Sequence, residues 1–202
     1  MFYDALENNH GLPYDPFKAL VSPRPIGWVS TLSQSGVANL APYSFFAAVA
    51  EKPAYVMFAG SGDKHSRRNA ENTGEFVCSI VTSELREKMN LTSARVPDDV
   101  SEFEFGGLTQ APSRFVAPPR VAESPAALEC RYWRTLEIPL QTPTAKPHAV
   151  VFGLVVGIYI DDRVIREGRV ITDLIRPISR LGYREYAEVS AANIFDMPPP
   201  QT

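Results

Sequence analysis

The chain has 202 residues, with 20 Lys and Arg against 23 Asp and Glu, which gives a formal net charge of −3. About 45% of the residues are apolar and 21% are charged, as in ordinary globular proteins, so an intrinsically disordered chain is excluded. This length is sufficient for one domain that buries its own core, and we expect a single domain over residues 1–202.

The weakly acidic balance, with a pI of about 5.7, excludes a nucleic-acid partner, because such proteins cluster Lys and Arg against phosphates. The first residues, "MFYDALENNH", lack the basic start and apolar stretch of a secretory signal. No apolar run approaches the roughly 18 residues that a membrane span requires. Cys78 and Cys130 show no metal-ligand spacing, so we expect no metal site and no disulfide framework. These features favour a cytoplasmic protein that does not bind membranes.

Six segments rich in β-branched and aromatic residues predict strands. The first two flank the turn "QSG" and predict a hairpin. In chain order the expected strands cover residues 26–33, 37–40, 54–59, 76–81, 128–138 and 149–160. Helices between consecutive strands, as in a parallel α/β protein, are missing from most of the chain. The fold class that we expect is therefore α+β, mainly antiparallel β, as a barrel or sandwich with short accessory helices.

Three short helices are expected. Ser66 is a candidate N-cap of the first, which Gly74 would end, and Ser83 is a candidate N-cap of the second. A third helix is expected around "DLIRPISRLG", where Pro177 would end or kink it. Between residues 95 and 124 the chain is irregular and rich in Pro and Gly, which fits either a segment covering a site or a surface loop.

Common catalytic and nucleotide motifs are absent. The sequence contains no GxGxxG, no GxxxxGK[ST], no HExxH and no GxSxG, and its three histidines are far apart. Neither hydrolysis nor a dinucleotide fold of the Rossmann type is therefore indicated.

Two blocks could bind a ligand. The segment "DKHSRRN", residues 63–69, places Lys64 and Ser66 at an expected helix start, where unpaired N–H groups favour an anion such as phosphate. The hairpin and its exit, residues 23–46, offer apolar faces with polar edges that suit a planar heteroaromatic ring. The alternative for both blocks is structural: solvated basic residues on a turn, and hydroxyls that satisfy a pleated surface.

Together, five segments in this order resemble the flavin reductase-like, FMN-binding split-barrel family, which includes flavoredoxin and the reductase components of two-component flavin monooxygenases. They are "SPRPIGWVSTLSQSGVANLAPYSFF", "DKHSRRNAENTGEFVCSIV", "LREKMNLTS", "HAVVFGLVVGIYIDD" and "RPISRLGYREYAEV". The resemblance runs from about Asp15 to Val189. It implies a split β-barrel that forms a homodimer and binds FMN at or near the subunit interface.

Carried over by position, the resemblance assigns the isoalloxazine and ribityl chain to the hairpin block and the phosphate to Lys64 and Ser66. The implied cofactor-binding residues are Arg24, Ser30, Thr31, Asn39, Leu40, Ala41, Pro42, Ser44, Phe45, Lys64, Ser66, Asn69 and Arg180. His65 stands where the family has an acidic residue, and Tyr183 replaces the second glycine of its "RLGG" pattern.

Other single residues have a structural and a functional interpretation. His148 matches a frequent family histidine and is the candidate catalytic residue facing nicotinamide or substrate, against a structural role at a strand end. Cys78 is expected in the core, and Trp28 and Trp133 are expected to pack the barrel.

The resemblance implies an FMN-dependent oxidoreductase that accepts hydride from NADH or NADPH and passes electrons to free flavin or a partner oxygenase. Two alternatives remain open. The chain could be a flavoredoxin-like electron carrier without a nicotinamide site, because no nicotinamide motif is recognisable, or a dimeric domain that has lost its cofactor.

Overall fold

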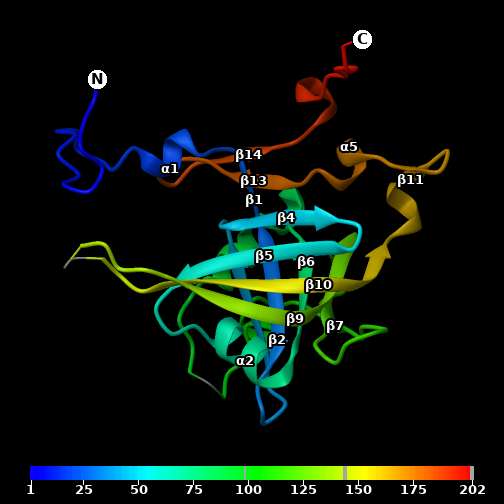
Figure 1. The fold of residues 1–202 in the computed structure, drawn as a ribbon. Helices are drawn as coiled ribbons and strands as arrows, with labels where there is room; N and C mark the ends of the chain where they lie inside the picture. Colours follow the sequence, from blue (N-terminus) through cyan, green and yellow to red (C-terminus); the bar gives the residue numbers. More distant parts are fainter. Residues whose placement is uncertain (98, 143–144, 201–202) are drawn as a thin grey trace.

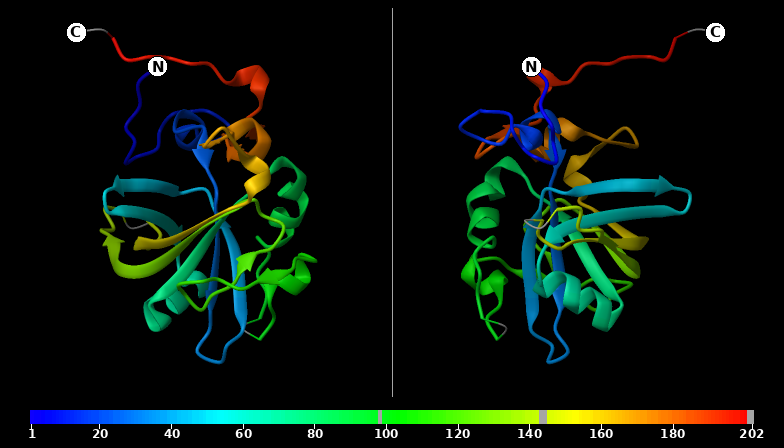
Figure 2. Two further views of the ribbon diagram at one scale, coloured as in Figure 1. Left: turned by 90° about the vertical axis from the view of Figure 1, so that its right-hand side faces the viewer. Right: turned by 60° about the vertical axis from the view of Figure 1, so that its left-hand side comes forward.

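The computed structural model of the protein describes residues 1–97, 99–142 and 145–200. Seven strands form one antiparallel sheet that curls into an open barrel (Figures 1 and 2). In spatial order they are β3 (Ala38–Tyr43), β2 (Gly27–Leu32), β6 (Glu75–Ile80), β9 (Ala126–Ile138), β10 (His148–Ile160), β5 (Ala54–Ser61) and β4 (Phe46–Glu51).

A second, three-stranded sheet lies above β4 in Figure 1 and joins the two ends of the chain. We call it the strap; its strands, in spatial order, are β1 (Arg24–Pro25), β13 (Ile178–Arg180) and β14 (Tyr186–Glu188). Both chain termini lie on the same side of the barrel as the strap, and α2 lies at the opposite end (Figure 1).

The remaining elements are short. Two small hairpins pair β7 (Gln110–Ala111) with β8 (Arg120–Val121) and β11 (Ile165–Arg166) with β12 (Arg169–Val170). The helices are α1 (Phe17–Leu20), α2 (His65–Thr73), α3 (Arg86–Leu91), α4 (Glu102–Phe105) and α5 (Thr172–Ile175), with 3-10 turns at Ser83–Leu85, Asp162–Val164 and Ala191–Asn193.

The barrel has a seam between its two edge strands. β3 and β4 lie at opposite edges of the sheet, although only Ser44 and Phe45 separate them in sequence. Within the described residues β3 pairs only with β2, and β4 pairs only with β5. The Phe45 carbonyl accepts a hydrogen bond from the Ala59 N–H, 2.8 Å away. The chain itself therefore bridges the edges, and no β-ladder closes the barrel at this point.

Both faces of β2 are buried. Trp28 and Val29 are consecutive, so their side chains point to opposite faces, and neither is exposed to solvent. Trp28 packs with residues of α3 and α4, and its indole Nε1 donates to Thr92 Oγ1 at 2.9 Å. Val29 packs with Phe58 and Phe76 on the other face. The helices after β6 thus cover the side of β2 that faces away from Phe58 and Phe76.

The structure confirms the mainly antiparallel α+β class and all six expected strands, with small shifts of their ends. It adds β4, whose sequence "FAAVAE" is rich in alanine and therefore gives little strand signal. Trp28 is buried as expected, but the expectation for Trp133 is wrong. That side chain is 56% exposed on β9 and makes edge contacts with Tyr55 and Phe152.

The helix caps differ from expectation. α2 begins at His65, so Ser66 lies inside its first turn and does not cap it, whereas Gly74 ends the helix with a left-handed φ of 79°. The Ser83 hydroxyl does not cap its helix either, because it donates to Glu188. The third expected helix is confined to α5, and the chain resumes as β13 directly after Pro177.

Gly153 provides a test of packing in the barrel. A Cβ at this position would lie 2.3 Å from Cζ of the fully buried Phe76. We expect Gly153→Ala to lower the free energy of unfolding by about 1–3 kcal/mol, because the core cannot accept an added methyl group without moving the ring. Urea unfolding of the variant measures this change. Adding Phe76→Leu should recover part of the loss, and strictly additive effects in the double variant would contradict this account.

Candidate functional site

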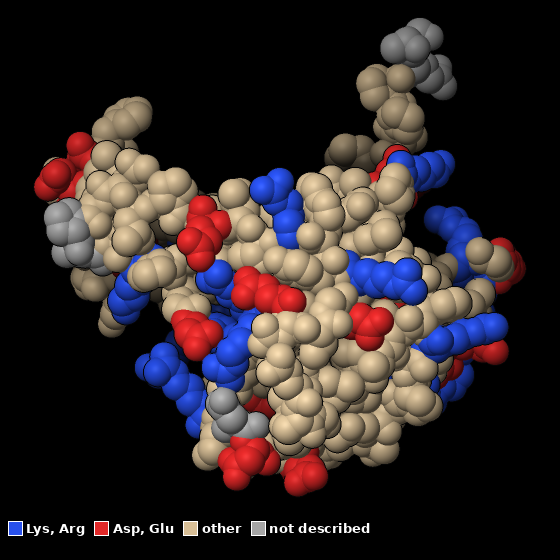
Figure 3. Space-filling model, turned by 60° about the horizontal axis from the view of Figure 1, so that its bottom comes forward, with Lys and Arg blue, Asp and Glu red and all other residues tan. Residues whose placement is uncertain are grey.

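A cleft with a volume of about 690 Å³ opens along the seam of the barrel. Most of its wall is formed by residues 41–45, from the end of β3 and the link after it, by residues 59–66, from the end of β5 to the start of α2, and by residues 92–96 after α3. Figure 3 views the molecule with the bottom of Figure 1 turned forward. Basic side chains gather beside a hollow at the left of this view. The sequence-predicted residues that line the cleft are Asn39, Ala41, Pro42, Ser44, Phe45, Lys64, Ser66 and His148.

The end of β3 and the link after it supply an apolar wall of the cleft. Ala41 and Pro42 near the end of β3, and Ser44 directly after it, line the cleft and are half-buried. Tyr43 is buried beneath them, with its ring centroid 4.8 Å from that of Phe58. Burial raises the pKa of Tyr43 to about 12, although a hydrogen bond with Ser66 opposes the shift. The phenol is therefore neutral throughout the physiological range.

The turn before α2 carries the cationic end of the cleft. Lys64 is the N-cap residue of α2, and its carbonyl accepts the Arg68 N–H at 3.0 Å. Gly60 lies against it: a Cβ there would come 3.1 Å from Tyr43 Cε1 and 3.9 Å from Lys64 Cγ. Gly62, with φ of +71°, turns the chain toward the helix. The glycines therefore allow the strand end, the tyrosine ring and the lysine stem to lie close together.

Asn39 is the centre of a buried hydrogen-bond network behind this turn. Its Oδ1 accepts from Ser66 Oγ at 2.9 Å and from Thr31 Oγ1 at 3.3 Å. Asn69 Nδ2 donates to Thr31 Oγ1 at 3.2 Å. All four side chains are nearly inaccessible, with exposed fractions of 6% or less. Thr31 and Asn69 therefore support the cleft from behind, while Asn39 and Ser66 reach its surface.

Glu102 of α4 completes the network from the other side of β3. Its carboxylate accepts from Asn39 Nδ2 at 2.7 Å and from the Leu40 N–H at 3.0 Å. Burial raises the pKa of Glu102 above its ordinary value, while the hydrogen bonds and the charge of nearby His65 oppose the shift. This buried carboxylate orients the Asn39 amide, and the amide in turn accepts from Ser66.

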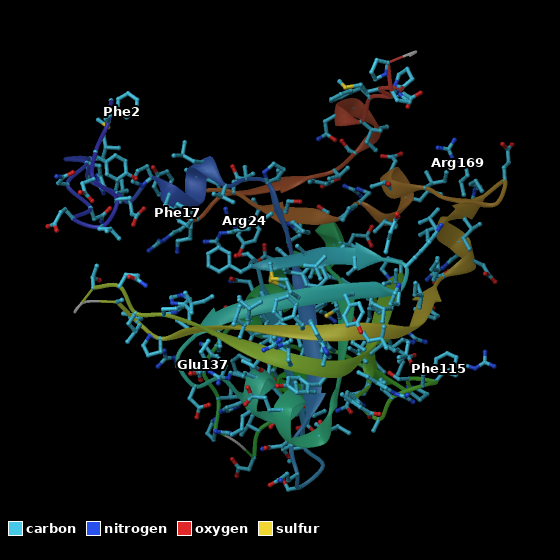
Figure 4. The ribbon with its side chains drawn as sticks, viewed as in Figure 1. Phe2, Phe17, Arg24, Phe115, Glu137 and Arg169 are labelled. Carbon is cyan, nitrogen blue, oxygen red and sulfur yellow. The ribbon has the colours of Figure 1, made fainter. Side chains whose placement is uncertain are left out.

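Some sequence-predicted residues lie outside the cleft lining. Leu40 is fully buried in the core, and the Ser30 hydroxyl donates to the Pro119 carbonyl. Arg24 belongs to β1 of the strap (Figure 4), and its side chain donates to the carbonyls of Lys18, Val21 and Leu181. Its guanidinium carbon is 5.9 Å from the ring centroid of Phe45, which does line the cleft. Arg24 therefore does not line the cleft itself, but lies next to the Phe45 ring that does.

Arg180 lies in an adjoining recess. It pairs with Arg24 across β13 and β1, donates to the Tyr186 hydroxyl and the Tyr183 carbonyl, and lies 4.5 Å from the Tyr186 ring centroid. A small hollow that it lines also contacts Pro42 and Ser44 of the cleft. Arg180 is thus a neighbour of the cleft and not part of its lining.

His148 is the first residue of β10 and lies opposite Ser61 at the mouth of the cleft. Its Nδ1 is 3.0 Å from the Lys146 carbonyl oxygen. Since a carbonyl can only accept, Nδ1 carries the proton in this contact, and Nε2 is the acceptor of the neutral ring.

Three charged residues of the cleft were not expected from the two sequence blocks. Glu102 and Arg95 come from the irregular segment that has no periodic pattern, and Lys18 comes from α1. None belongs to the two blocks that indicated ligand binding. For Arg95 and Glu102, the position in a long irregular segment beside the expected site was the only available signal.

An antiparallel barrel left open at a seam between its edge strands defines the class of split β-barrel proteins. Residues 20–181 match the model of the flavin reductase like domain. The chain belongs to this family, since the match spans most of its length. Membership indicates a flavoprotein, and it confirms both the family resemblance and the split-barrel fold expected from the sequence blocks.

Individual relatives are similar over most of the chain. An uncharacterized protein from Aquifex aeolicus is 38% identical over 175 residues, which cover 84% of this chain and 86% of that protein. Nitrilotriacetate monooxygenase component B from Bacillus cereus is 28% identical, with a TM-score of 0.86 and 98% of each chain covered. The 2-nitrobenzoate 2-nitroreductase NbaA from Pseudomonas fluorescens is also 28% identical, with a TM-score of 0.84 over 98% of this chain and 96% of that one.

Among the residues that the structure describes, no helix has the length and apolar character needed to cross a membrane. Over the same residues, no group of three or more His, Cys, Asp and Glu side chains is arranged to hold a metal ion.

Glu102 gives the protein a measurable pH dependence. Its raised pKa means that, as the pH rises above about 4.5, the unfolded chain loses this proton before the folded protein does. The free energy of unfolding should therefore fall as the pH rises from about 4.5 to the raised pKa of Glu102 in the folded protein. Glu102→Gln should abolish this contribution. Urea unfolding of both proteins between about pH 4 and 8 measures the difference. A wild-type curve that stays parallel to the Glu102→Gln curve would show that Glu102 titrates normally.

Proposed function

We propose that the protein is an FMN-dependent oxidoreductase that takes hydride from NADH or NADPH and supplies electrons to a second acceptor. One observation carries the proposal: the Lys64–Ser66 turn and the wall of residues 41–45 line the same cleft. FMN has a dianionic phosphate at one end and a planar apolar ring with polar edges at the other. A single continuous cleft with a cationic turn and an apolar wall fits both ends.

The donor set of the turn fits a phosphate. Lys64 contributes a positive charge, and Ser66, one residue into α2, contributes a hydroxyl beside the first N–H groups of a nine-residue helix. Lys18 and Arg95 add positive charge to the same cleft, and within the described residues neither has a carboxylate partner. In this proposal Lys64 and Ser66 hold the phosphate. The Ser66 hydroxyl has a single hydrogen, which it donates to Asn39 in this structure, so binding requires it to turn that hydrogen to a phosphate oxygen.

The wall of the cleft fits the ring system. Ala41, Pro42, Ser44 and Phe45 present backbone groups and small or apolar side chains, which would cover one face and one edge of the isoalloxazine. Bound FMN would supply the redox chemistry, accepting a hydride on its open face and releasing electrons to the acceptor. The chain's own residues orient the ring, exclude water from the covered face and place backbone donors at its edge. His148, at the mouth, is the proposed residue facing nicotinamide or substrate.

The acceptor in this proposal is free flavin or a partner oxygenase. The monooxygenase component named above, similar over nearly the whole chain, supports an oxygenase partner. We also propose a homodimer. The N-terminal segment carries exposed apolar side chains such as Phe2 and Phe17 (Figure 4), with exposed fractions of 106% and 56%. A second copy would cover such surfaces.

Anaerobic reduction tests the function. Purified protein loaded with FMN should bind it with defined stoichiometry, sediment as a dimer, and lose its flavin absorbance near 450 nm when NADH or NADPH is added. Binding without bleaching by either nucleotide would instead make the protein an electron carrier reduced by a partner. Failure to bind FMN, with no change in melting temperature, would remove the flavin function altogether.

Two substitutions test the phosphate site. Each hydrogen bond to a charged group contributes about 1.5–3 kcal/mol, so Lys64→Ala combined with Ser66→Ala should weaken FMN binding on the order of a hundredfold or more. Fluorescence titration measures the dissociation constant. Lys52→Ala, which removes an exposed lysine from the β4–β5 turn, is the matched control and should bind FMN normally. Unchanged affinity in the double variant, with an unchanged melting temperature, would place the phosphate elsewhere.

A further inference from the structure

A second recess, of about 480 Å³, lies between α3 and the strap. α3 packs beneath the strap strands (Figure 2). Thr82, shortly before α3, forms a β-bridge with Pro177, directly before β13 of the strap. The recess is lined by residues of α3, β13 and β14 and by the turn between the last two. None of its lining residues belongs to the cleft already described.

The recess carries an excess of positive charge. Arg86, Arg180 and Arg184 line it, and Glu87 is the only carboxylate among the lining residues. Glu87 lies 3.5 Å from Arg86 Nε, and both side chains are well exposed. Within the described residues, Arg180 and Arg184 have no carboxylate partner. Two guanidinium charges are thus left without an anion at one concave site.

The other lining groups suit a nucleobase. Met89 and Ile178 are buried apolar residues at the base of the recess, Tyr186 adds an aromatic ring, and Asn90 adds an amide. An apolar floor, an aromatic face and one amide are what a purine needs for stacking and edge hydrogen bonds. Arginine also binds phosphate monoesters with two parallel hydrogen bonds, which lysine cannot do.

The recess is connected to the flavin cleft. A hollow of about 150 Å³ shares Met89, Asn90, Arg180 and Tyr186 with the recess. The same hollow shares Pro42, Ser44 and Ser93 with the cleft. An extended molecule can therefore lie with one end against the cleft wall and its other end among the arginines.

We propose that this recess binds the 2′-phosphoadenosine end of NADPH and so makes NADPH the preferred hydride donor. The inference rests on the proposed function, since it names the reductant of that reaction. NADH and NADPH share the pyrophosphate, the nicotinamide and the adenine. Only NADPH carries the 2′-phosphate dianion, which the arginines of the recess would bind. Arg184 and Arg86 are the specificity-determining residues, while Arg180 also holds the turn through Tyr183 and Tyr186.

Direct nucleotide binding tests the proposal without turnover. Calorimetric titration of FMN-loaded protein with adenosine 2′,5′-bisphosphate and with adenosine 5′-diphosphate should show at least about tenfold tighter binding of the 2′-phosphate compound. Arg86→Ala combined with Arg184→Ala should abolish that difference, because these side chains lie on the surface and their removal leaves the core intact. Arg169→Ala is the matched control and should retain the difference. Arg169 lies on the exposed β11–β12 hairpin, to the right of the strap in Figure 4, and does not line the recess.

The outcomes separate this proposal from the function on which it rests. Equal binding of the two nucleotides, or a preference that survives the double variant, overturns the recess assignment even if NADH bleaches the flavin. If neither NADH nor NADPH bleaches it, the proposed function fails, and a selective 2′-phosphate site in the recess would still appear in the titration. In steady-state assays, the double variant should raise KM for NADPH by about tenfold and leave KM for NADH unchanged.

Discussion

The central constraint on this structure is the two-residue link between the edge strands of its sheet. Because Ser44 and Phe45 carry the chain from β3 directly to β4, the two edges come together without a ladder of hydrogen bonds between them. Backbone groups that a closed barrel would pair with each other remain available for a ligand. The cleft is therefore a consequence of the connectivity, and the loops around it only determine what it binds.

A buried amide gives that cleft its rigidity. Asn39 receives two donors and makes one donation, to the carboxylate of Glu102, and these partners come from three separate parts of the chain. Buried polar groups are costly unless every one is satisfied, so the network fixes the relative positions of β3, α2 and α4. The network thus positions the Ser66 oxygen and the neighbouring Lys64 before any ligand arrives, which reduces the entropy lost on binding.

The parts of this molecule that depend on short stretches of sequence were predictable. The strands follow from β-branched runs, Gly74 ends its helix in the left-handed conformation that glycine favours, and the segment "DKHSRRN" was predicted to start a helix. Contacts between distant residues were not predictable from pattern. Ser66 was expected to cap its helix, but its hydroxyl donates to Asn39, 27 positions away. Glu102, 63 positions from Asn39, sits in a segment without any periodicity, so nothing local pointed to its role.

The strap has a consequence for how the protein is made. β1 is among the first strands to leave the ribosome, but the residues it pairs with lie near the other end of the chain, and Arg24 donates to a carbonyl 157 positions later. During synthesis this strand has no partner, because its pairing surface has not yet been translated. The barrel can assemble around β2, β3 and β6 in the meantime. The strap can therefore form only after nearly the whole chain has been synthesised, and the arginine-lined recess is completed at the same time.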